Sequence, residues 1–250
     1  MINHIFSQHP YRCRFDWGPE GARRAAERGD IVVVVDTLSF STTVATAVSR
    51  GGIIYPCRDS AEADHIAQQV DAIKAVRRSA MTSKEFYSLS PGTFNNLKAG
   101  TKVVLPSING AACTLGAESA PYVFAGTLVN AEAVGTAIGR IMPASELCVT
   151  VIACGERDKE TGGLRVAVED EFGAGSVLSY LDFDKSPEAR VCESIFINNR
   201  DHLAELMWDC ISGRELRAVG YDDDVTAASR LNAFDVAPAL REGAYVPFDS

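Results

Sequence analysis

The sequence predicts an α/β fold built on a largely parallel central sheet. Residues Ile31-Val32-Val33-Val34-Val35 form an uninterrupted run of β-branched side chains, which is typical of a strand that is buried on both faces. The segments that follow alternate between helix and strand patterns, and this alternation indicates βαβ units. They are a helix at 41–48 that ends at Gly51-Gly52, a strand at 53–57, a helix at 60–70 and a strand at 72–76.

A polar stretch at 77–99 interrupts this alternation, and we interpret it as a long loop with one helical turn. Long loops in compact domains are often functional. Regular patterns then resume. We expect strands at 102–106, 122–125 and 147–154, helices at 111–118, 130–141, 168–181, 199–212 and 222–230, a charged hairpin or loop at 156–164, and an extended tail at 245–248. We predict one domain over residues 1–250, and the alternative is a helical appendage from about residue 185.

Composition limits the classes of function. The chain has 250 residues and a formal net charge of −9, without a basic face, so nucleic acid is not expected as a partner. Its seven cysteines form no CxxC pair; we expect reduced thiols and a cytoplasmic protein. The amino terminus lacks the segments of a signal peptide, and no apolar run reaches the ~20 residues of a membrane helix, so a membrane is not expected either.

The turn after the first buried strand combines an acid with hydroxyl groups. Asp36 ends the 31–35 run, so its carboxylate should lie at the carboxyl edge of the sheet, where ligands of open α/β sheets bind. Ser39, Ser41, Thr42 and Thr43 follow at the start of a helix, where free N–H groups and the helix dipole favour an anion. Such a turn suits an acid that holds a cation or attacks phosphorus. The alternative is simple capping of the helix.

Two later strand-to-helix junctions repeat this pattern. Asn109 and Gly110 follow the strand at 102–106, and Thr127 and Asn130 follow the strand at 122–125. Their amide and hydroxyl groups can donate to phosphate or sulfonate oxygens, and we expect the three junctions to converge on one ligand. The alternatives are an ordinary Asn-Gly turn and a plain helix N-cap.

A second acidic segment, Glu169-Asp170-Glu171, opens the helix expected at 168–181. Its functional interpretation is a Mg²⁺ site, since this cation takes one or two carboxylates together with water and substrate oxygens. The alternative is charge that complements the helix dipole. Asp222-Asp223-Asp224 is interpreted as a helix start, and Gly155-Glu156-Arg157 shows no evident chemistry.

Taken in order, these segments resemble the 2-phosphosulfolactate phosphatase family of coenzyme M biosynthesis. The family motif D-V-L-R-A-T-[ST]-T corresponds to residues 36–43, and G-N-S-P corresponds to 88–91, which adds Ser90 to the candidate residues. T-N-G-T corresponds to 108–111, G-S-x-x-N-A to 126–131 and A-L-E-D to 167–170. The likeness extends from about residue 28 to 248, and the order and spacing of the motifs are fairly specific.

The resemblance implies a three-layer α/β/α fold with a mixed, largely parallel central sheet. It also implies a Mg²⁺-dependent phosphatase that cleaves (2R)-2-phospho-3-sulfolactate to 3-sulfolactate and phosphate, and it is compatible with a homodimer. Two departures from the family pattern are Ser39, which stands where the family has Arg, and Leu89, which stands where it has Asn. Arg77 or Arg78 is the candidate to compensate for the missing cation.

The leading hypothesis is therefore a Mg²⁺-dependent hydrolase of a small anionic phosphate ester. Asp36 attacks phosphorus or holds the metal, and Glu169 or Asp170 completes the metal site or moves a proton. The residues expected to bind the substrate are Ser39, Ser41, Thr42, Thr43, Ser90, Asn109, Gly110, Thr127 and Asn130. The alternatives are a non-catalytic binder of a small anionic metabolite and an interaction protein that keeps only the scaffold.

Overall fold

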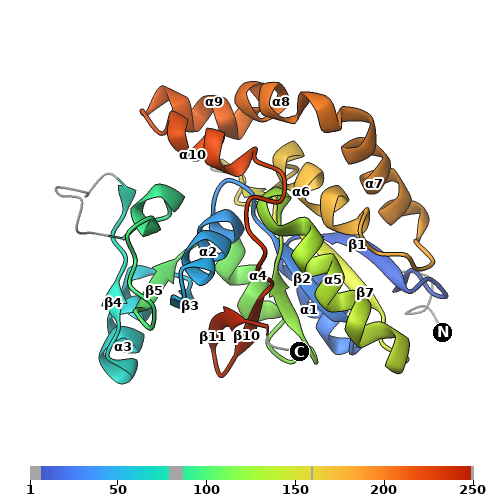
Figure 1. Cartoon of the computed structure of the whole chain (residues 1–250), viewed down its shortest axis with the longest axis horizontal. Coiled ribbons are helices and arrows are strands. Elements are labelled where there is room, and N and C mark those ends of the chain that lie inside the picture. Colours follow the sequence, from blue (N-terminus) through green and yellow to red (C-terminus); the bar gives the residue numbers. More distant parts are fainter. Residues whose placement is uncertain (1–6, 79–86, 159, 249–250) are drawn as a thin grey trace.

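The computed structural model describes residues 7–78, 87–158 and 160–248. A central nine-stranded sheet carries helices on both faces (Figure 1). Its strands are β1 (Cys13–Trp17), β2 (Ile31–Val35), β3 (Ile53–Cys57), β4 (Ile73–Lys74), β5 (Lys102–Pro106), β6 (Val123–Ala125), β7 (Val149–Ala153), β10 (Pro238–Arg241) and β11 (Ala244–Pro247). The helices are α1 (Gly18–Glu27), α2 (Phe40–Ser49), α3 (Ser60–Val70), α4 (Gly110–Gly116), α5 (Ala131–Ile141), α6 (Val168–Leu178), α7 (Pro187–Asn199), α8 (Leu203–Asp209), α9 (Ile211–Ala218) and α10 (Asp222–Ala228).

Strand β2 is buried along its whole length, as its β-branched run predicts. Successive side chains of a strand point to opposite faces of the sheet. Val33 and Val35 pack in one core cluster with residues of α5 and α6, whereas Val32 and Val34 pack in another with residues of α1 and α4. Helices thus cover both faces of β2, and the predicted α/β fold with three α/β/α layers is confirmed.

The sheet contains two parallel blocks joined by an antiparallel hairpin. Strands β1, β7, β2 and β6 form one block, and β3, β5 and β4 form the other. The hairpin β10–β11 lies between them and pairs antiparallel with β6 and with β3. The sheet is therefore mixed and largely parallel, as expected. The sequence predicted only an extended tail at 245–248, because a paired hairpin depends on contacts with distant strands.

Helices α7 to α10 form an arch over the carboxyl end of β2, at the top of Figure 1. Their apolar side chains, such as Phe196 and Met207, pack against Leu38 of the turn after β2. The single helix predicted at 199–212 is wrong, since α8 ends at Asp209 and α9 begins at Ile211. Cys210 breaks the helix because its backbone is extended, with φ −65° and ψ 164°.

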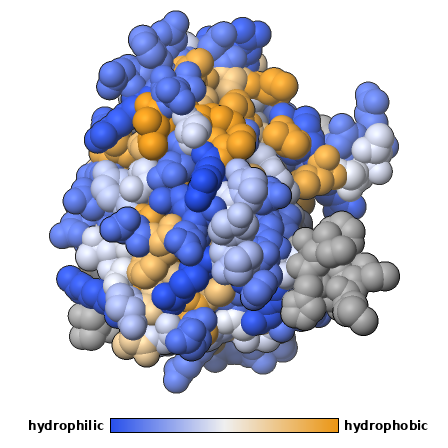
Figure 2. Space-filling view, turned by 90° about the vertical axis from the view of Figure 1, so that its right-hand side faces the viewer, coloured by the Kyte–Doolittle hydropathy of each residue, from blue (hydrophilic) through white to orange (hydrophobic). Residues whose placement is uncertain are grey.

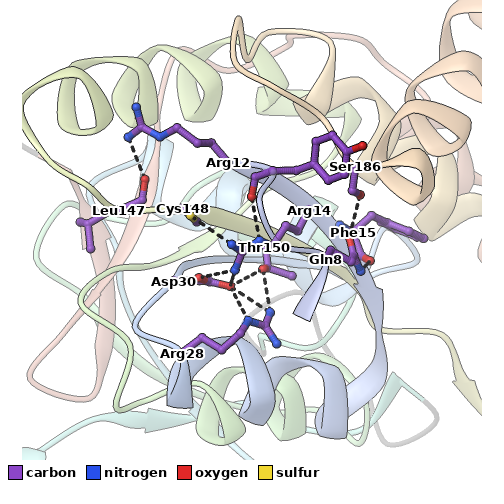
Figure 3. Close-up of polar contacts among 11 residues, drawn as sticks. Gln8, Arg12, Arg14, Phe15, Arg28, Asp30, Leu147, Cys148, Thr150 and Ser186 are labelled. Atoms are coloured by element: carbon purple, nitrogen blue, oxygen red, sulfur yellow. Dashed lines mark hydrogen bonds and ion pairs between the residues drawn. The ribbon is translucent and has the colours of Figure 1, made fainter. Parts of the chain in front are cut away.

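The amino ends of β1, β2 and β7 are joined by a buried polar network (Figure 3). Asp30, which precedes β2, accepts hydrogen bonds from Arg14 at 3.0 Å, Arg28 at 2.9 Å and Thr150 at 2.7 Å. No element was predicted before residue 31, and β1 and α1 are additions from the structure. In β1 the apolar residues Cys13, Phe15 and Trp17 alternate with Arg14 and Asp16, which is the pattern of a half-buried strand, so this signal was present in the sequence and was missed.

The remaining segments agree with the sequence in outline. The one helical turn expected in the loop at 77–99 is present at Pro91–Phe94, and residues 79–86 of that loop lie outside the described residues. A short hairpin, β8 (Glu156–Arg157) with β9 (Leu164–Arg165), occupies the segment predicted as a hairpin or loop. Within the described part of the chain, no helix combines the length and apolar character needed to cross a bilayer.

Candidate active site

The carboxylate of Asp36 is held at the end of β2 by two backbone amides. Its Oδ1 accepts the N–H of Phe40 at 3.0 Å, and its Oδ2 accepts the N–H of Gly110 at 2.9 Å. Only 7% of the residue is exposed. Burial raises the pKa of Asp36, the two amides and Arg78 oppose this effect, and the charge of Glu169 adds to it. Asp36 is thus a fixed carboxylate whose charge is only partly compensated.

The hydroxyl groups that follow Asp36 are bonded within the protein. Ser41 Oγ donates to the carbonyl of Val34 at 2.9 Å, and Thr42 Oγ1 donates to that of Thr37 at 2.8 Å. Thr43 Oγ1 donates to the carbonyl of Leu89 at 2.7 Å. These hydroxyl hydrogens fix the shape of the turn, in place of the open anion cradle that the sequence suggested.

The junction after β5 meets this turn directly. Gly110 begins α4, and its amide points at Asp36. A Cβ atom at this position would clash with the ring of Phe40, so the close approach requires glycine. Asn109 Nδ2 donates to Glu156 Oε2 at 2.8 Å. The structure therefore brings this predicted junction to Asp36. The amide of Gly110 donates to the carboxylate of Asp36, and the side chain of Asn109 donates to a second acid, Glu156.

The junction after β6 reaches the same turn through Thr37. Thr127 Oγ1 donates to Thr37 Oγ1 at 3.1 Å. Thr127 and Asn130 form a reciprocal capping box, and Asn130 Nδ2 donates to the carbonyls of Ala125 and Val236 at 3.1 Å each. Both residues are completely buried. The three junctions thus meet at one turn, and their convergence on one ligand stays a prediction. The polar groups of this junction bond within the protein and fix the shape of the turn.

The acidic start of α6 lies against the turn as well. Asp170 Oδ1 accepts the N–H of Thr37 at 2.7 Å, and its Oδ2 accepts the N–H of Gly155 at 2.8 Å. Burial raises the pKa of Asp170 well above its usual range, and the charges of Asp36 and Glu169 raise it further. Glu169 is only 2% exposed. The structure thus brings Asp36, Glu169 and Asp170 into one buried group.

Glu156 is a member of this group that the sequence analysis missed. It follows the end of β7, and its carboxylate accepts the amide of Asn109. Burial, followed by the charge of Asp36, raises the pKa of Glu156 to about 7. The signal that identifies Asp36, an acid close to the carboxyl end of a buried strand, also applies to Glu156, which lies three residues after the end of β7. Gly155-Glu156-Arg157 was interpreted as a segment without evident chemistry, and the structure places the carboxylate of Glu156 near the other buried acids.

Arg78 places a cation beside Ser39. Its Nη2 donates to Ser39 Oγ at 2.6 Å and to the carbonyl of Leu89 at 3.0 Å. Its Nε donates to Ser90 Oγ at 3.1 Å and to Asp224 Oδ2 at 3.0 Å. Of the two arginines considered as substitutes for the family Arg, Arg78 is therefore the one that contacts Ser39. Asp224, expected only to start a helix, also forms this buried ion pair from α10.

The carboxylates fit a loosely ligated cation better than a preformed metal cage. Among the residues that the structure describes, no group of three or more His, Cys, Asp or Glu side chains could hold a metal ion. Mg²⁺, however, commonly takes one or two carboxylates and fills its other positions with water and phosphate oxygens. Asp36, Glu156 and Asp170 each have a raised pKa, caused first by burial and then by neighbouring acidic charges, among which Glu169 acts on all three. A divalent cation would relieve this repulsion.

Together, these features define a class of protein. It is an α/β enzyme in which acidic groups and one arginine meet at the carboxyl end of a central parallel strand, where such folds bind small ligands. The sequence matches the family model described as 2-phosphosulpholactate phosphatase over residues 19–243, and the chain belongs to this family. By this membership it is a phosphatase, a hydrolase of phosphoric monoesters.

Relatives at low identity support this placement over most of the chain. The protein named "Probable 2-phosphosulfolactate phosphatase" of Carboxydothermus hydrogenoformans is 30% identical over 91% of this chain and 93% of its own length. The 2-phosphosulfolactate phosphatase of Methanocaldococcus jannaschii is 25% identical over 83% of this chain and 87% of its own length. These identities are those of a divergent member.

Proposed function

We propose that this chain hydrolyses 2-phosphosulfolactate to 3-sulfolactate and phosphate, and that it uses Mg²⁺. Relatives with this activity in their names align over nearly the whole chain. The observation that carries the proposal is the position of Asp36, a buried carboxylate that two backbone amides hold in one orientation. Arg78 and three further acids, Glu156, Glu169 and Asp170, are close enough to change the pKa of Asp36 or of its neighbours.

Asp36 is the proposed nucleophile. Its attack forms a bond to phosphorus while the bond between phosphorus and the ester oxygen breaks. Glu156 passes its proton to the departing oxygen, and a pKa of about 7 suits this task near neutral pH. Water then attacks the aspartyl phosphate, returns a proton to Glu156 and releases phosphate. The amides of Phe40 and Gly110 keep the carboxylate in one orientation throughout.

Glu169 and Asp170 are the proposed holders of Mg²⁺, with Asp36 beside them. When bound, the cation supplies charge that neutralises phosphoryl oxygens. Asp170 is already oriented by the amides of Thr37 and Gly155, so its placement relative to Asp36 is fixed. Its role is thus to keep the cation close to the nucleophile.

The expected substrate-binding residues fall into two groups in this proposal. Ser39, Ser90 and Asn109 lie next to Arg78 or Glu156, and they are the proposed polar neighbours of the substrate. The others act by shaping the pocket, because their polar groups bond to the protein itself. These are Ser41, Thr42, Thr43, Gly110, Thr127 and Asn130.

Phosphate release from 2-phosphosulfolactate tests the proposal. The native chain with Mg²⁺ should release phosphate, and Asp36→Asn should reduce kcat by at least about a thousandfold, since the nucleophile is lost. Glu132→Gln, in α5, serves as a control with the same chemical change. A native chain that binds phosphate or 3-sulfolactate but turns over no phosphate ester would instead indicate a non-catalytic binder.

A homodimer and a cytoplasmic location also remain proposals. Figure 2 shows hydrophobic residues gathered in the upper part of one face, at the height of the α7–α10 arch. Exposed apolar side chains in these helices include Val191, Ile197 and Ile211, and such surfaces often mark association. Light scattering of the purified chain would give its mass in solution. The seven cysteines are free, which suits a reducing compartment.

A further inference from the structure

Arg78 is held in place by hydrogen bonds from two of its three guanidinium nitrogens. Nε donates to Ser90 and Asp224, and Nη2 donates to Ser39 and to the carbonyl of Leu89. Its plane lies near the ring of Tyr221, with 5.3 Å between the guanidinium carbon and the ring centroid. These contacts come from three separate segments of the chain, at Ser39, at Leu89-Ser90 and at Tyr221 to Asp224. The orientation of the guanidinium is therefore fixed before any ligand arrives.

The third nitrogen of the guanidinium, Nη1, takes no part in this arrangement. Among the described residues, none of the hydrogen bonds that hold Arg78 is donated by Nη1. The side chain is 18% exposed and its partner Asp224 only 6%. Within the described part of the chain, Nη1 is thus the nitrogen of Arg78 that can donate to an oxygen of a tetrahedral anion.

The charge around Asp36 gives a reason for such an anchor. Asp36, Glu156, Glu169 and Asp170 form an acidic group in a chain whose net charge is −9. An anionic substrate is repelled there unless a cation attracts it. Arg78 contacts Ser39, and the next residue, Phe40, donates its N–H to Asp36, so a substrate bound by Arg78 would lie beside the turn that holds the nucleophile.

We propose that Arg78 is the residue that binds a tetrahedral oxyanion of the substrate, with Ser39, Ser90 and Asp224 holding its guanidinium in position. The inference rests on the proposed function for the identity of the substrate. It adds the specificity-determining contact, which comes from the loop after β4. The oxyanion is either the phosphoryl group or the sulfonate, and both offer the same geometry to a guanidinium.

A purely structural arginine would have a different signature. If Arg78 served only to tie the 87–90 segment to α10, its removal would lower the melting temperature and leave kcat/KM unchanged. Binding of an oxyanion instead requires Nη1 to be presented while Nε and Nη2 stay anchored, so a lysine that keeps the charge should recover only part of the activity. Kinetics on folded variants therefore separate the two roles.

The experiment compares Arg78→Ala, Arg78→Lys and Arg24→Ala in the full chain, well below their melting temperatures. Arg24, in α1, is an exposed arginine and serves as the matched control for loss of one positive charge. We expect kcat/KM for 2-phosphosulfolactate to fall about 100-fold in Arg78→Ala and about 10-fold in Arg78→Lys, with Arg24→Ala unchanged. A value for folded Arg78→Ala within threefold of the native value would overturn the proposal.

A second substrate identifies the oxyanion. Phospholactate keeps the phosphoryl group and lacks the sulfonate. An equal loss on both substrates in Arg78→Ala assigns Arg78 to the phosphoryl group, whereas a loss confined to 2-phosphosulfolactate assigns it to the sulfonate. In the double variant Ser39→Arg with Arg78→Ala, a guanidinium returns to the same place from the opposite side of the 2.6 Å contact. This variant should regain at least tenfold over Arg78→Ala.

Binding of inorganic phosphate and of 3-sulfolactate, measured by calorimetry, keeps this inference separate from the proposed function. If the native chain turns over no phosphate ester, the proposed function fails, yet weaker binding of either anion by Arg78→Ala still supports the role of Arg78. If the native chain is active and Arg78→Ala binds both anions and turns over substrate like the native chain, the role of Arg78 fails and the proposed function stands.

Discussion

Two aspartates bracket strand β2, and they differ in what neutralises them. Asp30, at the amino end, is paired with the guanidinium groups of Arg14 and Arg28 and accepts the hydroxyl of Thr150 (Figure 3). Asp36, at the carboxyl end, accepts two backbone amides, and burial raises its pKa, as does the charge of Glu169. The two residues are almost equally buried, at 3% and 7% exposure.

The two ends of β2 therefore carry buried carboxylates of two kinds: one that stabilises the fold and one that is available for chemistry. A buried carboxylate with two cations is satisfied, and its removal would leave those cations unpaired. A buried carboxylate with incomplete compensation is costly to the fold, but it is ready to take a cation or to react. The amino end of the sheet therefore contributes stability, and the carboxyl end contributes the site.

The largest effect is expected on the free energy of unfolding when each of the two aspartates is replaced in turn by asparagine. Asp30→Asn should lower the free energy of unfolding by about 3–5 kcal/mol, because Arg14 and Arg28 lose their buried counter-charge. Asp36→Asn should stay within about 1 kcal/mol of the native chain, since relief of a buried charge offsets one lost N–H acceptor. Urea unfolding at pH 7 measures both.

Each variant is the control for the other, because the chemical change and the strand are the same. Asp30→Asn should keep its kcat wherever it is folded, whereas Asp36→Asn should keep its fold and lose its kcat. Similar losses of stability in the two variants would contradict the division between the two ends of β2.

The sequence alone was sufficient for the parts of the site that follow a local rule. The run at Ile31–Val35 fixed β2, and the acid after it identified Asp36. Asn109 and Thr127 were found by the same reasoning at later junctions. This succeeds because strand ends and helix starts leave a pattern within a few residues. The antiparallel hairpin β10–β11 leaves no such pattern, since its place in the sheet depends on β3 and β6.

The parts that the sequence could not supply depend on distant contacts. Arg78 and Asp224 are 146 residues apart in the chain, and a run of three aspartates in sequence gives no sign that one is buried against an arginine. Asn109 and Glu156 meet in the same way across 47 residues. The hydroxyls of Ser41 and Thr42 were predicted to bind an anion, but in the structure they donate to backbone carbonyls. These acceptors cannot be identified from the sequence, because they come close only when the turn has folded.

A second, smaller effect should come from the pH dependence of stability. The pKa of Glu156 rises from 4.5 to about 7 on folding, so the folded chain binds more protons than the unfolded chain between these values. Its contribution to stability is present below pH 4.5 and is lost as the pH rises to about 7. Relative to Glu156→Gln, the native chain should lose up to about 3 kcal/mol across this interval.

Urea unfolding of the native chain and Glu156→Gln at half-unit steps from pH 4 to pH 8 measures this loss. The two free energies of unfolding should be similar near pH 4.5, should move apart as the pH rises to about 7, and should then run parallel. A constant difference over the whole series would show that Glu156 is not in the acidic surroundings described for it.

The smallest effect tests whether the carboxyl end obtains its missing positive charge from a cation. At pH 8, Mg²⁺ at ten times its Kd should stabilise the folded chain by about 1.4 kcal/mol, or a few degrees in melting temperature. At pH 5 the shift should shrink, because Glu156, with a pKa of about 7, is then protonated, and the raised pKa of Asp36 and of Asp170 lets protons compete better with the cation. Asp170→Asn should reduce the shift at pH 8, and potassium chloride of equal ionic strength should not reproduce it. A shift that is equal at both pH values, or that persists in Asp170→Asn, would mean that the cation binds elsewhere.

Asp30 needs no such cation because Arg14 and Arg28 are built into the fold, and this is why the acids at the other end of β2 are the ones that should respond to Mg²⁺.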